Sequence, residues 1–320
     1  MGATLAVPAG AKGASPAVLI IPGPGATNRD GPIVARPADP LYLDLSNTLT
    51  SAGMVTLRYD HRGIGDSQME SGQQLSWEDM VEDAWEALAF LSQRREVDAK
   101  RLVVIGHDMG GVIAMRLAAT DDRIKGVGLI STPGRTLVDV WADSYRFTHG
   151  PASSDAYRAM IGDLMTNGAL PARDVMRPEF QSLLPPNQDA FFRAMFSVDP
   201  VKEAKGVRQP VFLVTGDRST AVKAVDAERL SQTLGGAEGV DGRPQRQLQP
   251  PAGADRTGTA LRPARHGLPR PGPAGGGGAP GADVGGRDGR LPGRRRRGLR
   301  RLAGALAPRS EGRSGPRLAR

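Results

Sequence analysis

Cysteine is missing from all 320 residues of this chain, and no apolar run approaches the roughly 18 residues that a membrane-spanning helix needs. The first absence excludes disulfides, thiolate metal sites and cysteine nucleophiles. The opening MGATLAVPAG also lacks the basic segment and the apolar segment of a secretion signal. We therefore expect a cytoplasmic protein with no membrane partner.

Residues 236–320 lack lysine, isoleucine, methionine, asparagine, phenylalanine, tyrosine and tryptophan. They contain 18 arginines against six acidic residues, a net charge of +12, so residues 1–235 carry −4 of the net +8. With its 20 glycines and 11 prolines, this segment cannot bury enough apolar surface to offset the entropy of ordering its backbone. The composition predicts a disordered tail and places any folded core within 1–235.

Three interpretations of residues 236–320 remain open. Arginine clusters such as 294–297 could bind nucleic-acid phosphates electrostatically, although the segment has no phenylalanine, tyrosine or tryptophan to stack on bases. The segment could be a solvated tail without a partner. It could also come from a shifted reading frame, because its abundant residue types have G/C-rich codons and most of its missing types have A/T-rich ones.

Apolar runs alternate with amphipathic stretches along residues 1–235. Buried strands are expected at 17–21, 54–59, 101–105, 124–130 and 210–215, and helices at 41–52, 77–93, 112–119 and 222–234. Ser76 followed by Asp79 indicates a capping box before one of these helices. The alternation, with strands that are mostly apolar, predicts an α/β fold in which a mainly parallel sheet has helices on both faces.

The alternation stops at about 136–200, where helix-like segments rich in methionine and phenylalanine follow a strand. An insertion at the carboxyl end of a strand lies over the ligand edge of an open α/β sheet, so we expect a helical cap there. We expect six of its large apolar side chains to pack the cap, with the lining of an acyl pocket as the alternative. They are Met160, Met165, Phe191, Phe192, Met195 and Phe196.

The sequence VVIGHDMGG joins the predicted strand 101–105 to the predicted helix 112–119. A strand, a sharp turn with small flanking residues and a helix are typical of a nucleophile elbow. Such a turn exposes one side chain above the sheet and directs the next backbone N–H at an oxyanion. The spacing from Gly106 to Gly110 fits, and Asp108 holds the central position, where the motif has serine.

Several segments, in the same order, resemble the bacterial α/β-hydrolase fold enzymes of the esterase and serine-aminopeptidase type. The matching segments are AVLIIPGPGATNRDG, LYLDLSNTL, GMVTLRYDHRGIGDS, VDAKRLVVIGHDMGG and PVFLVTGDRS, and LLPPNQDAFFRAMFSVDP resembles the cap of that family. The resemblance covers residues 3–235. It implies an α/β-hydrolase fold with a helical cap, hydrolysis of carboxylic esters or related acyl compounds, and no metal or organic cofactor.

The resemblance places the nucleophile at Asp108. An aspartate there is the arrangement of dehalogenase- and epoxide-hydrolase-like relatives, in which a carboxylate attacks carbon. The alternative is a helix N-cap residue tolerated at a strained turn. The resemblance also implies an oxyanion hole formed by Met109 and by the loop with Gly23, Pro24 and Gly25, and proline has no N–H to donate there.

The acid and the base of the implied triad have weaker candidates. Ser219 holds the position of the acid, and Asp217, two residues earlier, is either a substitute acid or an ordinary turn carboxylate. The base should follow a last strand near 245–265, which falls within the glycine- and proline-rich tail. His266 has no strand pattern before it, and His61 is a weak substitute base.

Charged residues surround the candidate site in the segments RYDHRGIGDS and NRD. We expect Asp60, Arg62 and Asp66 to form structural ion pairs that hold their loop. We expect residues 28–30 to hold the oxyanion loop in the same way. His107, next to the elbow, is expected to be a structural residue that faces the sheet.

Three functions remain possible from this pattern. The first is a hydrolase of small-molecule esters or related acyl compounds whose activity is impaired, because Asp108 replaces the serine and the base is missing. The second is an active hydrolase of the dehalogenase or epoxide-hydrolase type, with Asp108 as nucleophile and His61 as base. The third is a non-enzymatic protein whose basic tail binds nucleic acid.

Overall fold

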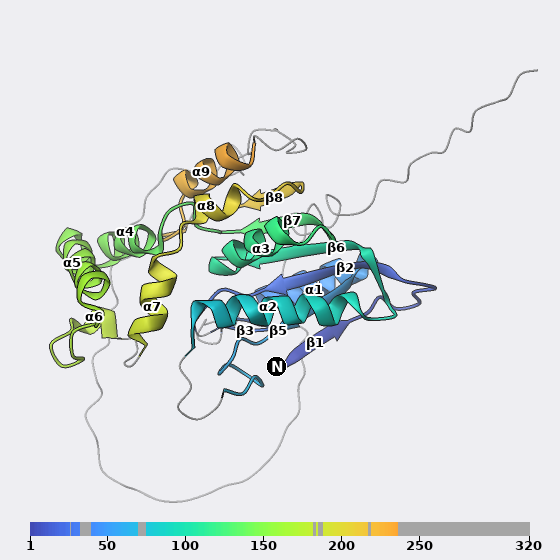
Figure 1. The fold of residues 1–320 in the computed structure, drawn as a ribbon, viewed down its shortest axis with the longest axis horizontal. Helices are drawn as coiled ribbons and strands as arrows, with labels where there is room; N and C mark the ends of the chain where they lie inside the picture. Colours follow the sequence, from blue (N-terminus) through green and yellow to red (C-terminus); the bar gives the residue numbers. More distant parts are fainter. Residues whose placement is uncertain are drawn as a thin grey trace, which may run out of the picture. The chain divides into compact units, whose positions relative to one another are not determined.

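A six-stranded sheet lies at the centre of the fold in the computed structural model of this chain, which describes residues 1–25, 27–32, 40–69, 75–181, 184, 188–216 and 219–235 (Figure 1). The strands are β1 (Ala3–Ala6), β2 (Ser15–Ile21), β5 (Val55–Tyr59), β6 (Val97–His107), β7 (Ile124–Ile130) and β8 (Val211–Val214). Their order is β1-β5-β2-β6-β7-β8. β1 is antiparallel to β5 and the other neighbours are parallel, which confirms the mainly parallel sheet.

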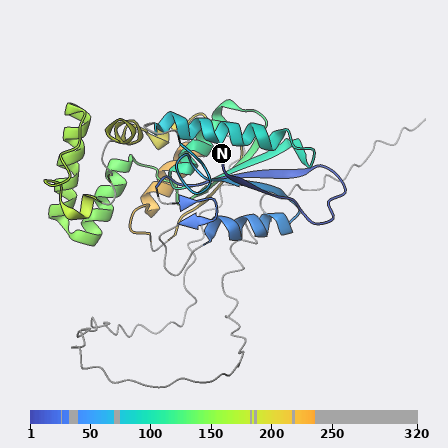
Figure 2. The ribbon, with the colours of Figure 1, turned by 90° about the horizontal axis from the view of Figure 1, so that it is seen from below.

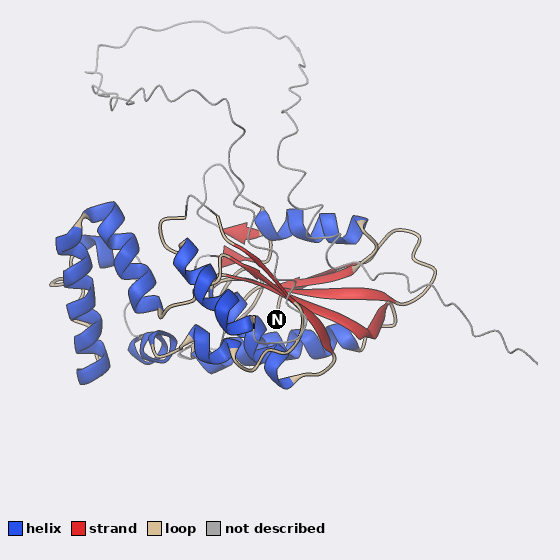
Figure 3. Cartoon of the chain, turned by 90° about the horizontal axis from the view of Figure 1, so that it is seen from above, coloured by secondary structure: helices blue, strands red, loops and turns tan. Residues whose placement is uncertain are grey.

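Helices cover both faces of this sheet. Figures 2 and 3 show α1 (Leu41–Ser51) on one face, with α2 (Trp77–Ser92) and α3 (Met109–Thr120) on the other. Val18 and Ile20 of β2 pack with α1, whereas the alternate residues of β2 join the cluster on the opposite face. Since each face is covered, the middle strands can be apolar throughout, as their sequences indicate.

The start of α2 follows the predicted capping box. The Asp79 N–H donates to Ser76 Oγ at 3.0 Å, and the Ser76 N–H donates to Asp79 Oδ2 at 2.8 Å. These two bonds satisfy N–H groups that the first turn of a helix leaves without a backbone partner. The capping box therefore fixes where α2 begins.

Five described helices lie between β7 and β8 in the sequence, and the first four of them gather at the left of Figure 1. These four are α4 (Leu137–His149), α5 (Pro151–Asn167), α6 (Pro178–Gln181) and α7 (Asp189–Phe196). Five of the six predicted packing residues of this segment are buried in the main apolar cluster. The prediction was wrong for Met165, which is 39% exposed. Leu164 takes the buried position, and one residue later the helix has turned by about 100° toward solvent.

A short two-stranded ribbon lies beside the loop after β2. It pairs β3 (Thr27–Asn28) antiparallel with β4 (Gly31–Pro32). The side-chain oxygen Oδ1 of Asn28 accepts the N–H groups of Asp30 and Gly31 at 2.9 and 3.1 Å. These bonds close the turn of the ribbon, in agreement with the expected structural role of residues 28–30.

β8, α8 (Pro200–Ala204) and α9 (Ala224–Leu234) complete the described part of the chain. The tail expected at 236–320 and the last strand expected near 245–265 lie outside the described residues. The division into a core at 1–235 with a cap at about 136–200 stays a prediction. Within the described residues, no helix has the length and apolar character needed to span a bilayer.

Candidate active site

Asp108 connects β6 to α3 through a sharp turn. Its backbone has φ +53° and ψ −129°, a region that residues other than glycine rarely adopt. The Asp108 N–H donates to the Ile130 carbonyl at 3.0 Å, and the Gly111 N–H donates to the Asp108 carbonyl at 3.0 Å. Neighbouring elements thus hold the strained backbone on both sides. The turn has the strand, strained residue and helix of a nucleophile elbow, with aspartate at its tip.

Two glycines permit this turn to form. A Cβ atom on Gly106 would overlap the Gly110 carbonyl. A Cβ atom on Gly110 would lie 2.5 Å from the carbonyl oxygens of Ile21 and Pro22. The spacing in the sequence therefore reflects close approach of β6, α3 and the loop after β2.

The Asp108 carboxyl is half-buried and closely surrounded by protein. This burial raises its pKa from 3.8 to about 6, and a hydrogen bond from the Met109 N–H opposes the shift. The side chain makes no helix-capping hydrogen bond within the described residues. Asp108 occupies the N-cap position without acting as a cap, so capping alone gives no reason for an aspartate here.

The loop after β2 lies against the elbow and has few N–H groups to offer an oxyanion. The Gly23 N–H donates to the Tyr42 hydroxyl at 3.2 Å. Pro24 has no N–H, and Gly25 is exposed at φ +94°. The Met109 N–H already faces the Asp108 carboxyl. Of the four expected oxyanion positions, two have their N–H engaged and a third has none.

His61 is buried beside this loop. Its Nε2 donates to the Pro22 carbonyl at 3.0 Å, because a carbonyl can only accept. Burial lowers the pKa of this imidazole from 6.5 to about 4, so the ring is neutral at pH 7. Nδ1 has no partner among the described residues. His61 thus supports the oxyanion loop, and in the described part of the chain it makes no hydrogen bond to Asp108.

The other acid and base candidates, Asp217 and His266, and the two remaining histidines, His149 and His107, lie in different places. Asp217 and His266 lie outside the described residues. His149 is exposed at the end of α4, with its ring 6.0 Å from that of Tyr145. His107, at the end of β6, has its Nδ1 2.9 Å from the Tyr42 hydroxyl, in agreement with the expected structural role.

Ion pairs brace the loop that follows β5 and tie it to the turn between β3 and β4, which follows the oxyanion loop. Arg29 NH1 lies 2.5 Å from Asp60 Oδ2, and Arg29 NH2 pairs with Asp66. Asp30 pairs with Arg58. The expected structural role of these charges is confirmed, and Asp60 also accepts the backbone N–H groups of Arg29 and Asp66.

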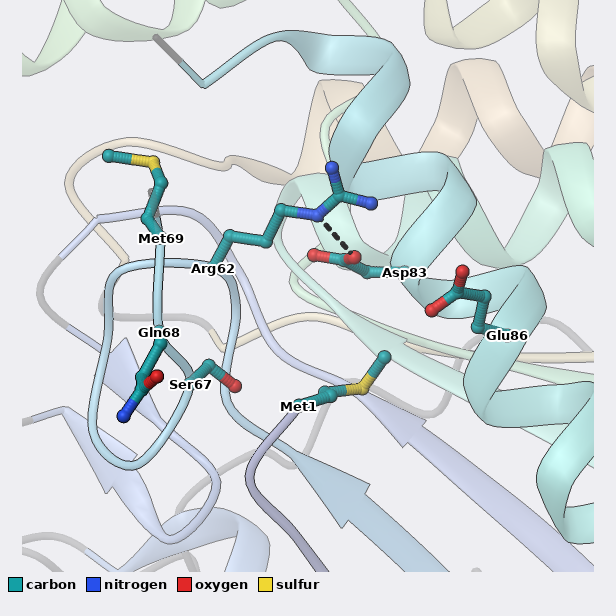
Figure 4. A pocket seen from close by; sticks show the side chains of 7 residues that line it. All are labelled: Met1, Arg62, Ser67, Gln68, Met69, Asp83 and Glu86. Atoms are coloured by element: carbon teal, nitrogen blue, oxygen red, sulfur yellow. Dashed lines mark hydrogen bonds and ion pairs between the residues drawn. The ribbon is translucent and has the colours of Figure 1, made fainter. Parts of the chain in front are cut away.

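Arg62 turns the other way, toward α2. Its guanidinium donates to Asp79 and Asp83 at 2.7 Å and to Glu82 at 3.0 Å. Figure 4 shows the Arg62–Asp83 ion pair beside a polar cavity of about 460 Å³. The lining residues are Met1, Arg62, Ser67, Gln68, Met69, Asp83 and Glu86. Neither the elbow nor the oxyanion loop lines this cavity, so it is separate from the candidate site.

Tyr42 is the residue of this site that sequence reasoning missed. It lies in the first turn of α1, and its hydroxyl contacts both the oxyanion loop and His107. Its contact with His107 spans 65 residues, and no local spacing rule predicts such a contact. The single signal in the sequence is an aromatic residue at the start of a helix that follows the predicted oxyanion loop.

No group of three or more histidine or acidic side chains in the described ranges is placed to hold a metal ion. The chemistry available at the elbow is that of a carboxyl group, neighbouring backbone N–H groups and the polar side chains of Tyr42 and His107. Such a set can bind a polar or acyl group. It can also form a covalent ester on the carboxylate.

Comparison with known proteins points to hydrolases. The family model described as "Serine aminopeptidase, S33" matches residues 40–145. Esterase EstD of Thermotoga maritima is 26% identical over 236 residues, which cover 74% of this chain and 54% of EstD. Thiohydrolase apmlB of Arthrinium phaeospermum is 27% identical over 115 residues, which cover 36% of this chain and 34% of apmlB. The chain thus spans about half the length of EstD.

Solved structures give a weaker comparison. The structure of Est1E from Butyrivibrio proteoclasticus with ferulic acid bound has a TM-score of 0.49 at 19% identity, over 72% of this chain and 81% of that chain. The fold is identified from the sheet order and the elbow described above, together with the matched family model.

Proposed function

We propose that this chain, which has the α/β-hydrolase fold and resembles esterase-type hydrolases, binds carboxylic esters or related acyl compounds at its elbow and hydrolyses them poorly. The single observation that carries the proposal is Asp108 at the tip of a well-formed elbow, with φ +53°. The backbone supports a site of this type. The side chain at its tip does not supply the hydroxyl nucleophile that ester hydrolysis in this family requires.

The weakness of Asp108 in acyl transfer follows from its chemistry. When a carboxylate oxygen attacks an ester carbonyl, the alkoxide leaves and a mixed anhydride forms. The attacking group is weak, and the leaving alkoxide needs a proton. A general acid or base contributes about 10²–10⁴-fold at such a step. His61 donates its Nε2–H to the Pro22 carbonyl, so that proton is already engaged.

The oxyanion loop supports the same conclusion. A tetrahedral intermediate needs N–H donors directed at its negative oxygen, and removal of one donor costs about 10²–10³-fold in turnover. Here the Gly23 N–H is held by Tyr42, and Pro24 has no N–H to offer. We therefore propose Gly25 as the remaining donor of a weakened oxyanion hole, joined by Met109 only when its N–H leaves the Asp108 carboxyl.

The experiment compares the full chain with its Asp108→Asn variant on p-nitrophenyl acetate and p-nitrophenyl butyrate at pH 7.5. We expect equal, slow hydrolysis, because the carboxylate does not support turnover. Protection of the chain against thermal unfolding by a non-hydrolysable acyl compound would show that the site still binds. Rapid hydrolysis that disappears in Asp108→Asn would refute the impairment.

A second function is favoured by the same aspartate. Its carboxylate oxygen could attack a saturated carbon of a haloalkane, with the carbon–halogen bond breaking and halide leaving with the electron pair, to give an alkyl ester on Asp108. Water must then cleave the ester, with His61 as proposed base and Asp217 as proposed acid. His61 could take that role only if its Nδ1 served, or if its Nε2 left the Pro22 carbonyl.

Mass spectrometry of the intact chain after exposure to haloalkanes or epoxides tests this second function. An adduct on the peptide that contains Asp108, absent in Asp108→Asn, would support it. Absence of both adduct and turnover would remove it. The third possibility, nucleic-acid binding by residues 236–320, concerns residues outside the described ranges and stays a prediction from charge.

A further inference from the structure

Tyr42 joins two groups that lie next to Asp108. Its hydroxyl accepts the Gly23 N–H at 3.2 Å and lies 2.9 Å from His107 Nδ1. The rings of Tyr42 and His107 meet edge to face, with centroids 5.8 Å apart. Tyr42 is only 1% exposed, so bulk water does not compete for these bonds.

The proton of the Tyr42 hydroxyl decides which group donates in the hydrogen bond between Tyr42 and His107. The hydroxyl accepts from Gly23, and its own proton needs an acceptor in a buried site. His107 Nδ1 is that acceptor when it carries no proton. A neutral His107 that accepts this proton holds its own proton on Nε2, and we infer this tautomer for the ring.

Gly23 forms a wall of the space around Asp108. A methyl group on Gly23 would lie 3.1 Å from Asp108 Cβ and 3.4 Å from its Oδ2. His107 precedes Asp108 directly and fixes the other side of the turn. Burial raises the pKa of Tyr42, and the charge of Asp108 adds to that rise.

We propose that Tyr42 is a positioning residue of the candidate active site, which clamps the loop after β2 and His107 around Asp108 and keeps water from its carboxyl. The proposal rests on the proposed function in one respect, which is that Asp108 lies in the substrate-binding site. Without the hydroxyl, the Gly23 N–H and His107 Nδ1 lose a shared partner. The loop can then move from the elbow and water can reach the carboxyl.

The test compares the full chain with its Tyr42→Phe variant, with ¹³C in the aspartate carboxyl carbons. The Asp108 signal is assigned by its loss in Asp108→Asn, and its shift is followed against pH. The parent chain is expected to titrate near 6 and the variant nearer the ordinary 3.8. Equal midpoints in the two chains overturn the proposal.

Tyr59→Phe is the matched control. Tyr59 is also buried, and its hydroxyl has no partner within the described residues. This change removes a core hydroxyl without touching the Tyr42 contacts, and it should leave the Asp108 midpoint unchanged. If Tyr59→Phe moves the midpoint as far as Tyr42→Phe, general loosening of the core explains the shift and the proposal fails.

A measurement on the parent chain keeps the proposal testable if Tyr42→Phe does not fold. Two-bond ¹⁵N–¹H correlations of labelled histidine distinguish the two tautomers of His107. We expect the proton on Nε2, and a proton on Nδ1 overturns the proposal. Neither readout depends on turnover, so vigorous ester hydrolysis would contradict the proposed function alone.

Discussion

At the elbow, the backbone determines the geometry of the turn, whereas the side chain of residue 108 determines its chemistry. Gly106 and Gly110 allow the close approach of β6 and α3, and the strained φ at Asp108 is held by bonds to Ile130 and Gly111. All of these features would serve a serine equally well. The chemistry at the tip therefore depends on residue 108 and on the groups that could move its proton.

Replacing the carboxylate with a hydroxyl should not by itself restore hydrolysis. Asp108→Ser supplies the nucleophile, but a serine hydroxyl needs a base to remove its proton, and under the proposed function no base acts at this site, which costs about 10²–10⁴-fold. We expect p-nitrophenyl acetate hydrolysis by Asp108→Ser to stay at the rate of Asp108→Asn. Fast turnover by Asp108→Ser would mean that a base is already in place.

The buried carboxylate should also cost stability at neutral pH. Its pKa is 3.8 when unperturbed and about 6 in the fold, so the charged form is disfavoured by about 3 kcal/mol. Because the folded chain holds this proton more tightly than the unfolded chain, the free energy of unfolding is highest below pH 3.8. It falls as the pH rises from 3.8 to about 6. Asp108→Asn should therefore be more stable than the parent above pH 6, with the advantage gone near pH 3.8.

Urea unfolding at pH 4 and pH 7.5 measures this difference. Asp163→Asn is the control, because Asp163 is exposed on α5 and takes part in no ion pair within the described residues. It should change the free energy of unfolding little at either pH. A parent chain that is more stable than Asp108→Asn at pH 7.5 would show that the carboxylate has a favourable partner.

At the scale of single residues, the sequence predicts what local spacing encodes. Gly106, Asp108 and Gly110 are readable because an elbow needs them at fixed intervals. Asp60 and Arg62 could be predicted as ion-pairing residues because opposite charges lie close together in one short loop segment. The role of Tyr42 could not be predicted, because the packing of α1 against the sheet brings its partners together. Such packing leaves no pattern in the neighbouring sequence.

Among the elements, a buried ion pair ties the loop after β7 to α9. Asp226 is fully buried and accepts the Arg135 Nε and NH2 groups at 3.0 Å, together with the backbone N–H groups of Gly134 and Lys223. Arg135 also reaches Asp143 on α4 at 2.8 Å. One guanidinium therefore connects the base of the predicted cap to the last described helix.

Arg135→Met should be strongly destabilising. Removing one partner of a buried pair leaves the other charge uncompensated, at a cost of about 3–5 kcal/mol in the free energy of unfolding. Arg158→Met is the matched control on α5, because the Arg158–Asp139 pair is 44% and 41% exposed. An exposed pair contributes about 0–1 kcal/mol. Similar losses in the two variants, measured by urea unfolding, would argue against the buried pair as a connection.

Element boundaries were predicted where hydrophobic pattern and caps agree. The strand 124–130 matches β7 fully, and the capping box set the start of α2. β6 begins at Val97, earlier than the predicted 101, and the prediction missed this start because residues 98–100 (DAK) carry no apolar strand pattern. β1 was missed because four residues beside a glycine- and proline-containing stretch are too short to show alternation.

For the molecule as a whole, the outer position of β8 in the described sheet bears on self-association. It is the outer strand in the order of the described sheet, and none of its four residues is fully buried. Outer strands offer unpaired backbone groups to other chains, which makes them sites of self-association unless charge or a covering element protects them. The VFLV sequence of β8 carries no charge.

We therefore expect the full chain to self-associate through β8, and Val214→Lys to reduce that association. Val214 is 42% exposed at the end of the strand, and a lysine there places charge on the edge without disturbing buried packing. Val225→Lys is the control, since Val225 is 38% exposed but lies on α9. Light scattering coupled to size-exclusion chromatography, over a range of concentrations, gives the associated fraction. If both lysines lower it equally, general surface hydrophobicity is responsible, and the edge of β8 has no special part in the association.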